Sequence, residues 1–201
     1  MERRRWLWLA AGLAILLAGR VSAQPADLPA EPMLRIDAQG HIAQIRRIAT
    51  DAKERFAVTA SDDKTVRVWS LPDGKLQRTI WLPSGDGDLG KAYAVALSPD
   101  GATIAVGGWT EPVGSSIYLF DRASGALTQR LPGLPDVVLH LAFSPDGRRL
   151  AAAVWGANGI RVFDAGDGYR LLPSDSDYGD SSYWSISTAT GAWFLRAMTG
   201  S

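Results

Sequence analysis

The chain has 201 residues, of which 46% are hydrophobic, and its 21 basic and 21 acidic side chains balance. This composition is typical of a globular protein and excludes a predominantly disordered chain. The absence of Cys excludes a disulfide framework, a thiol nucleophile and a thiolate metal site. Plentiful Gly and Pro favour short strands joined by turns, which indicates an all-β protein.

Residues 1–23 have the pattern of a cleaved export signal. A basic start at 2–5 precedes an apolar run at 6–18, and small residues follow at 21–23. A membrane anchor is the competing interpretation, but the run of about 13 residues is shorter than the roughly 20 needed to span a bilayer. We predict cleavage, a linker at 24–32, no membrane span afterwards, and a location in the bacterial periplasm.

The charge that remains after cleavage argues against a nucleic-acid partner. The signal holds four Arg and one Glu, so its removal leaves 17 basic and 20 acidic residues and a formal charge of −3. A protein that binds nucleic acid through the phosphate backbone needs an excess of basic side chains. We therefore expect no nucleic-acid partner.

A repeated turn motif divides the rest of the chain. The sequence ALSPDG at 96–101 returns 46 residues later as AFSPDG at 142–147. In each copy Pro presets φ and Gly accepts a positive φ, as a tight turn requires. Apolar segments flank both turns, at 93–97 and 103–106 and again at 137–143 and 150–154, so each copy predicts a β-hairpin.

Each hairpin is followed by two more predicted strands. The third strands lie at 65–69, 116–121 and 159–164, and a turn and a fourth strand come after each, weakest in AGDGYRLL at 165–172. Units of four short strands recurring about every 45 residues are typical of a β-propeller. The predicted fold is therefore all-β, an incomplete propeller ring of about three four-stranded antiparallel blades plus a broken fourth.

The first unit resembles the WD-repeat (tryptophan–aspartate repeat) family. It holds a Gly-His pair at 40–41, a Ser-x-Asp turn at 61–63 and the closing strand TVRVW at 65–69. The resemblance covers roughly 33–172, although Ser70 stands where the family usually has Asp. The second and third units keep that Asp, as Asp121 and Asp164, but have Phe in place of Trp and lack Gly-His.

The resemblance implies a structural role for four polar residues of the first unit. In such blades a His, a Ser or Thr, an Asp and the Trp form a buried hydrogen-bond chain, and the matching positions are His41, Thr59, Asp63 and Trp69. We therefore interpret His41 as structural rather than catalytic. The other two units lack these groups, so we expect apolar packing alone to hold them.

No motif in the sequence predicts an enzyme, a cofactor or a metal centre. The chain has two His and no Cys, and it lacks a nucleophile elbow, a zinc-binding HExxH and a phosphate-binding Gly loop. The acidic stretch at 175–180 does not have the full spacing of an EF-hand. Strict alternation along 137–143 would place Val138, His140 and Ala142 on one face of a strand and the residues between them on the other.

Trp109 and Trp155 are the candidate partner-binding residues. Each follows the second predicted strand of its unit, at a blade end where propeller loops present themselves to partners. Aromatic side chains in such loops are suited to anchor a binding partner. Packing between blades is the other interpretation, and the sequence leaves both open.

The tail at 173–201 breaks the repeat. One permitted back-translation of 186–201 in the neighbouring frame contains DFDRDGRL, which parallels AFSPDGRRL at 142–150. Our hypothesis is that the tail is the fourth blade read in the wrong frame and that the chain is a truncated propeller.

The function that the resemblance implies is that of a non-enzymatic scaffold. A rigid propeller in the cell envelope would present its loops to a protein partner, whose identity the sequence leaves unknown. One alternative is a sensing or docking domain of a longer enzyme, such as a peptidase. Another is binding of a small ligand or sugar at the Trp-bearing loops.

Overall fold

The computed structural model describes residues 39–173 and the backbone of two further strands, 183–187 and 194–198. The predicted signal at 1–23, the linker at 24–32 and the acidic stretch at 175–180 lie outside the described residues, as does most of the tail. Within the described residues, no helix has the length and apolar character to span a membrane.

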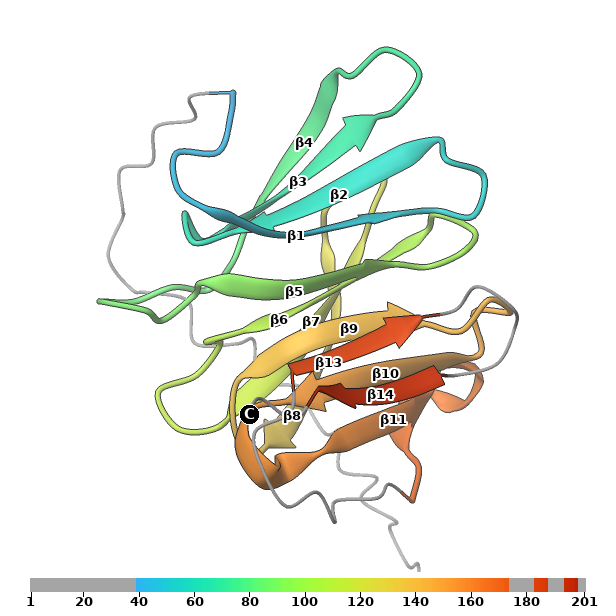
Figure 1. The fold of residues 1–201 in the computed structure, drawn as a ribbon. Coiled ribbons are helices and arrows are strands. Elements are labelled where there is room, and N and C mark those ends of the chain that lie inside the picture. The colour runs from blue at the N-terminus through green and yellow to red at the C-terminus, as the bar shows by residue number, and fades with distance from the viewer. Residues whose placement is uncertain (1–38, 174–182, 188–193, 199–201) are drawn as a thin grey trace, which may run out of the picture. The chain divides into compact units, whose positions relative to one another are not determined.

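Three four-stranded antiparallel sheets, each with its strands in chain order, make up the described part of the fold (Figure 1). The first consists of β1 (Ile45–Thr50), β2 (Phe56–Ser61), β3 (Thr65–Ser70) and β4 (Leu76–Trp81). The second consists of β5 (Ala92–Leu97), β6 (Thr103–Gly108), β7 (Ser115–Asp121) and β8 (Leu127–Leu134). The third consists of β9 (Val138–Phe143), β10 (Arg149–Val154), β11 (Ile160–Asp164) and β12 (Arg170–Leu171).

Short elements complete the list. Two 3-10 turns, η1 (Gly156–Asn158) and η2 (Ala165–Asp167), flank β11, and β13 (Tyr183–Ser187) pairs with β14 (Phe194–Met198). The three sheets confirm the prediction of three four-stranded antiparallel blades in an all-β fold. The weak fourth strand of the third unit is present, but it has only two residues.

Apolar side chains from neighbouring sheets form the core. Val58, Val66 and Val68 of the first sheet pack in one cluster with residues of the second, such as Ile104 and Phe120. The opposite face of the second sheet packs on the third in the same way. Because a single sheet exposes an apolar face unless another element covers it, this stacking accounts for the β-branched and small apolar residues on both faces of β6.

The turn that joins the first two strands of each sheet is built in the same way three times. Ser98 Oγ accepts a hydrogen bond from the Thr103 backbone N–H at 2.9 Å, and Ser144 Oγ accepts one from Arg149 at 2.9 Å. In the first sheet, Asp51 takes this role and accepts from the Phe56 N–H at 3.0 Å. The first unit therefore has the same turn without the Ser-Pro-Asp-Gly sequence.

Burial and hydrogen bonding act in opposite directions on Asp51. Burial by itself would raise the pKa of this carboxyl, but hydrogen bonds from Phe56 and Arg55 stabilise the charged form more strongly, so the pKa lies below its usual value. Arg55 donates to Asp51 from both its backbone N–H and its Nε, at 2.7 and 2.8 Å. The turn is consequently fixed by a buried, ionised side chain.

A bulge in the first strand of every sheet corrects one prediction. The pairing register shifts by one residue at Arg46 in β1, at Tyr93 in β5 and at Leu139 in β9. An extra residue at such a point changes which side chains share a face. Val138 accordingly packs with Leu141 and Phe143, whereas Ala142 lies against a separate cluster, so the strict alternation predicted for 137–143 was wrong.

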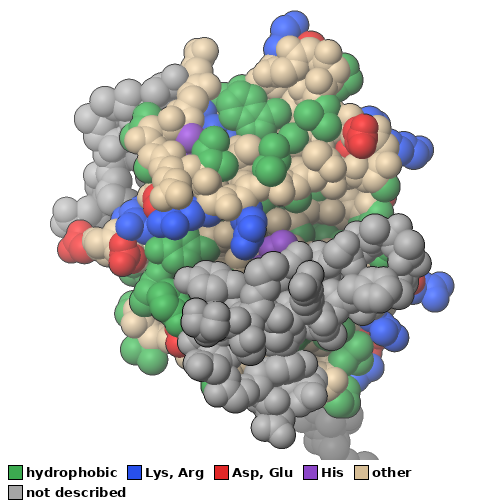
Figure 2. Space-filling view, in the orientation of Figure 1, with side chains coloured by type: hydrophobic (Ala, Val, Ile, Leu, Met, Phe, Trp, Pro, Cys, Tyr) green, Lys and Arg blue, Asp and Glu red, His purple; other side chains and the backbone are tan. Residues whose placement is uncertain are grey.

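An exposed apolar row lies along β1. Ile45 and Ile48 are 50% and 65% exposed, and Figure 2 shows hydrophobic side chains gathered over this sheet. By register, these residues correspond to Ala92 and Val95 of β5, which are buried against the first sheet. The row therefore occupies the positions that, in the second sheet, pack against a neighbouring sheet.

The shared turn also contains a strained residue in the first sheet. Gly101 and Gly147 have φ values of 74° and 72°, and Glu54 occupies the corresponding position with φ of 53°. A side chain in the left-handed region costs roughly 1–2 kcal/mol, whereas Gly adopts it freely.

We expect Glu54→Gly to stabilise the protein by about 0.5 kcal/mol. Relief of the left-handed strain, roughly 1–2 kcal/mol, exceeds the roughly 0.4–1 kcal/mol of extra unfolded-chain entropy that Gly adds. Urea denaturation measures the difference. Lys53→Gly is the control because Lys53 is exposed and its φ is not positive, so that change should destabilise. Equal losses from both changes would contradict the assignment of strain.

Candidate functional site

Four side chains of the first sheet form a continuous hydrogen-bond chain. His41 Nδ1 lies 2.8 Å from Asp63 Oδ2, and its Nε2 lies 2.7 Å from Thr59 Oγ1. Trp69 Nε1 donates to the same hydroxyl at 2.9 Å. The structure thus brings together the four residues that the family resemblance singled out, from a loop, two strands and a turn.

Each element places its side chain for a local reason. Thr59 on β2 and Trp69 on β3 lie on one face of the first sheet, within reach across the strand pair. Asp63 in the β2–β3 turn accepts the Thr65 backbone N–H at 3.0 Å, which fixes the turn, and it also accepts the Ile42 N–H at 3.1 Å. This second bond ties the loop before β1 to the turn.

One proton arrangement satisfies the whole chain. A carboxylate only accepts, so His41 donates from Nδ1 to Asp63. Thr59 accepts the indole N–H of Trp69 and donates its own proton to His41 Nε2. The side chains of His41 and Asp63 are 3% and 2% exposed. With both ring nitrogens engaged in this arrangement, His41 has no free ring nitrogen to offer a substrate.

Asp63 is held in its ionised form. Burial would raise the pKa of this carboxyl, but hydrogen bonds from Thr65, His41 and the Ile42 N–H outweigh that effect, and the pKa is lowered. The closest of these bonds comes from Thr65 Oγ1 at 2.6 Å. The charge of Asp63 is thereby stabilised by directed hydrogen-bond donors.

The second sheet has a polar network that the sequence did not predict. Thr110 Oγ1 accepts the Ser116 backbone N–H at 2.7 Å and lies 2.8 Å from Ser115 Oγ. Glu111 accepts from Ser116 Oγ and forms an ion pair with Arg130. The expectation that apolar packing alone holds the second unit was therefore wrong. Thr110 lies just after β6, and Ser115 and Ser116 begin β7. Polar residues at these strand ends are the one signal that would have revealed the network.

Trp109 and Trp155 occupy matching places at one end of the sheets. Each donates its backbone N–H to the segment before the first strand of its sheet, Trp109 to Lys91 O at 3.1 Å and Trp155 to Val137 O at 2.8 Å. We call this end of the sheets the loop face. It comprises the connections β2–β3, β4–β5, β6–β7, β8–β9 and β10–β11, at residues 62–64, 82–91, 109–114, 135–137 and 155–159 (Figure 1).

The two Trp residues differ in exposure. The Trp155 side chain is 46% exposed, whereas Trp109 is half-buried. Val113, in the β6–β7 connection, is 89% exposed. The loop face therefore offers solvent an aromatic and an aliphatic side chain, and the Thr110 network holds the loop that carries Val113 in place.

His140 lies apart from these groups. It is largely buried on β9, and its Nδ1 has no hydrogen-bond partner among the described residues. Burial, aided by the nearby Arg47, lowers the pKa of His140 to about 4. The described part of the chain contains no group of three His, Cys, Asp or Glu side chains placed to hold a metal.

The fold and the hydrogen-bond chain together define a WD-repeat type of β-propeller. Residues 34–70 match the family model "WD domain, G-beta repeat". The chain therefore carries a WD repeat, and its three sheets have the fold of WD-repeat propellers.

Known relatives are WD-repeat proteins. The chain is 30% identical to the small ribosomal subunit protein RACK1 of Caenorhabditis elegans, over 76% of this chain and 44% of that protein. It is 26% identical to the WD repeat-containing protein SL1-17 of Schistosoma mansoni, over 68% of this chain and 56% of that one. It is 31% identical to Coronin-7 of Rattus norvegicus, over 55% of this chain and 12% of that one.

A solved structure shows the same fold. The RRP9 WD40 repeats superpose with a TM-score of 0.60 at 19% identity, covering 71% of this chain and 42% of that chain. The chain spans little more than half the length of the curated relatives it matches, or less.

The lowered pKa of Asp63 predicts how stability depends on pH. A carboxyl whose pKa is lower in the folded state contributes stability above its unfolded pKa, near the usual 3.8, and loses it as pH falls through the folded value. Asp63→Asn should cost about 1.5–3 kcal/mol at pH 7, the usual size for hydrogen bonds to a charged group. The gap between wild type and variant should narrow below about pH 4.

Urea denaturation at pH 7, 5, 4 and 3 measures this gap. Asp86→Asn is the matched control, since Asp86 is exposed and its change should leave the stability near that of wild type at each pH. A gap that stays constant from pH 7 to pH 3 would contradict the role assigned to the Asp63 charge.

Proposed function

We propose that this chain is a non-enzymatic docking scaffold that binds a protein partner through its loop face. The observation that carries the proposal is the exposure of Trp155 and Val113 on connections fixed by hydrogen bonds to the sheets. Aromatic anchors presented on a rigid frame bind with little loss of conformational entropy. The relatives support this class of function, since one of them is named as a subunit protein of a larger assembly, the small ribosomal subunit.

The His residues support a scaffold over an enzyme. Nucleophilic or acid–base catalysis needs a reactive side chain within hydrogen-bond reach of a second group and open to a substrate. His41 is buried with both ring nitrogens bonded, and His140 is largely buried with its Nδ1 unpaired among the described residues. Neither of the two His therefore meets the requirement in this arrangement.

The loop face is tested by substitution and co-purification. We expect the double change Trp155→Ala, Val113→Asp to reduce retention of the co-purifying partner at least tenfold, because loss of an anchor costs about 2 kcal/mol or more. Quantitative mass spectrometry of proteins retained by the tagged full chain measures the effect. Leu71→Asp is the control, because Leu71 is 40% exposed and lies in the β3–β4 turn, outside the loop face.

Two results would overturn this assignment. One is retention of the same partner at equal levels by wild type and the double variant. The other is equal loss in the double variant and in Leu71→Asp, which would trace the effect to general surface change rather than to the loop face. Thermal unfolding of each variant separates lost binding from lost folding.

We further propose that residues 1–23 export the chain to the bacterial cell envelope. Their basic start, apolar run and small residues before Gln24 support export. Fused to alkaline phosphatase, which is active only outside the cytoplasm, residues 1–23 should give activity in a bacterium. Leu13→Arg interrupts the apolar run and should abolish that activity. An inactive unmodified fusion would contradict the proposal.

A further inference from the structure

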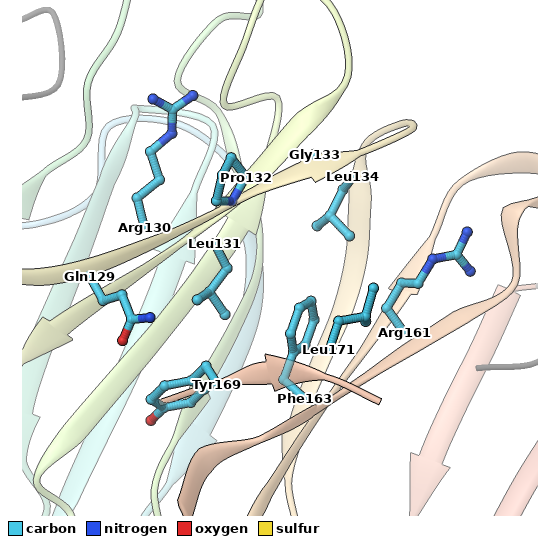
Figure 3. Close-up of a pocket in the computed structure, with 10 residues that line it drawn as sticks. All are labelled: Gln129, Arg130, Leu131, Pro132, Gly133, Leu134, Arg161, Phe163, Tyr169 and Leu171. Atoms are coloured by element: carbon cyan, nitrogen blue, oxygen red, sulfur yellow. The ribbon is translucent and has the colours of Figure 1, made fainter. Parts of the chain in front are cut away.

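A groove separates the outer strand of the second sheet from the outer part of the third. Its volume is about 260 Å³. Leu131 and Leu134 of β8 face Phe163 and Leu171 of the third sheet across it, with Tyr169 at one side (Figure 3). We call it the outer groove. The side chains of Arg130 and Arg161 also line it, and they extend toward opposite sides of the apolar centre.

The groove arises from a departure from the repeat. Between the first and second sheets, Arg78 Nη2 donates to Ala123 O at 2.7 Å, and the arm of Arg78 passes over Gly125. By register, Gln129 occupies the same position on β8 and donates to Gly168 O at 2.9 Å. The Gln side chain is shorter, so less side-chain volume lies between the second and third sheets.

The length of β12 adds to this space. The outer strands β4 and β8 have six and eight residues, whereas β12 has two. It pairs with β11 only through Phe163 and Asp164, so Arg161 lies beyond the part of β11 that pairs with β12. An apolar centre with a charged residue beside it is therefore left open to one side.

The lining of the groove is positively charged. No Asp or Glu is among its lining residues. Arg130 already forms an ion pair with Glu111 outside the groove. Arg161 bonds only to carbonyl oxygens, from Nη1 to Asn158 O at 2.7 Å and to Ile160 O at 3.3 Å, and within residues 39–173 it has no carboxylate partner. Its guanidinium is thus oriented by the backbone, and its charge has no counter-ion within that part of the chain.

We propose that the outer groove binds an extended acidic segment of a partner protein, which inserts one large apolar side chain and pairs a carboxylate with Arg161. The volume of about 260 Å³ is below the range usual for small-molecule pockets, roughly 300–1,000 Å³. It fits one side chain of the size of Leu or Phe. Arg suits the recognition because its planar guanidinium donates to a carboxylate through two parallel bonds.

Side chains rather than strand pairing provide the recognition on the β8 side. β8 carries Pro132, which has no N–H to donate, and Gly133 follows it in the left-handed region. Pro on an edge strand blocks the addition of another strand. The bound segment therefore lies over the apolar centre without extending the second sheet.

The outer groove and the loop face share no residue, although Arg161 and Arg130 of the groove bond to Asn158 and Glu111 in the loop-face connections. None of its lining residues belongs to the connections that make up the loop face, and neither Trp155 nor Val113 contributes to it. Binding at one site can therefore fail in an experiment while binding at the other persists.

Fluorescence polarisation with three labelled hexapeptides and the full chain tests the proposal. The first peptide, GDDFDG, has both the acidic and the apolar feature, GKKFKG reverses the charge, and GDDGDG lacks the apolar side chain. We expect GDDFDG to bind about tenfold more tightly than either of the others, because GKKFKG loses a hydrogen bond to a charged group and GDDGDG loses the burial of an apolar side chain. Arg161→Glu should reverse the preference in favour of GKKFKG.

Matched variants identify the site. Leu171→Ser should weaken GDDFDG while leaving the preference for acidic over basic peptides, because Leu171 lies in the apolar part of the groove and is half exposed. Arg148→Glu makes the same charge change at an exposed residue outside the groove and should leave all three affinities unchanged. Thermal unfolding of each variant confirms that it is folded.

Four outcomes would overturn the proposal. The first three are dissociation constants above about 1 mM for every peptide, equal affinity for the acidic and basic peptides, and an effect of Arg148→Glu as large as that of Arg161→Glu. The fourth is equal affinity for GDDGDG and GDDFDG, which would show that charge attraction alone, without the apolar part of the groove, accounts for binding.

Discussion

The packing of one sheet face on the next is the interaction on which the rest of this structure depends. A four-stranded sheet has two faces and buries neither by itself. In this chain the second sheet is covered on both sides, and its two clusters of apolar residues join it to the first and third sheets. Because the same kind of contact is made twice, the turns and the loop face recur at matching places on each sheet, whereas the outer groove arises where the two contacts differ.

The architecture could be predicted from the sequence because the same strand and turn pattern occurs in each repeat. Two copies of Ser-Pro-Asp-Gly and three closing strands fixed the number of sheets, and most strand bounds were within two residues of those observed. The hydrogen-bond chain of His41, Thr59, Asp63 and Trp69 was also readable, since each residue occupies a position typical of the family. Such features depend on local pattern and on the repeat, which a single sequence displays.

The features that escaped the sequence depend on contacts between distant segments or on small changes of register. The bulge in β9 moved Val138 to the face of Leu141, and alternation along the strand gives no sign of an inserted residue. The outer groove depends on Gln129 in β8, at the position where β4 has Arg78. Gln129 donates to Gly168 in the turn before β12, a contact between residues 39 positions apart in the chain. The effect of either feature can be predicted only when the positions of the neighbouring sheets are known.

Residues that differ between the three sheets fall into two kinds, those that make an equivalent contact in each sheet and those that do not. At equivalent positions the three sheets use Asp51, Ser98 and Ser144 for one and the same bond, so exchange among these residues preserves the fold. The side chains of Trp155 and Arg161 have no such shared task, and neither side chain contributes to the buried core. A residue that the fold does not require is free to vary with a partner. In a propeller whose sheets share one architecture, the side chains that distinguish one sheet from the others are therefore the ones able to determine which partner binds.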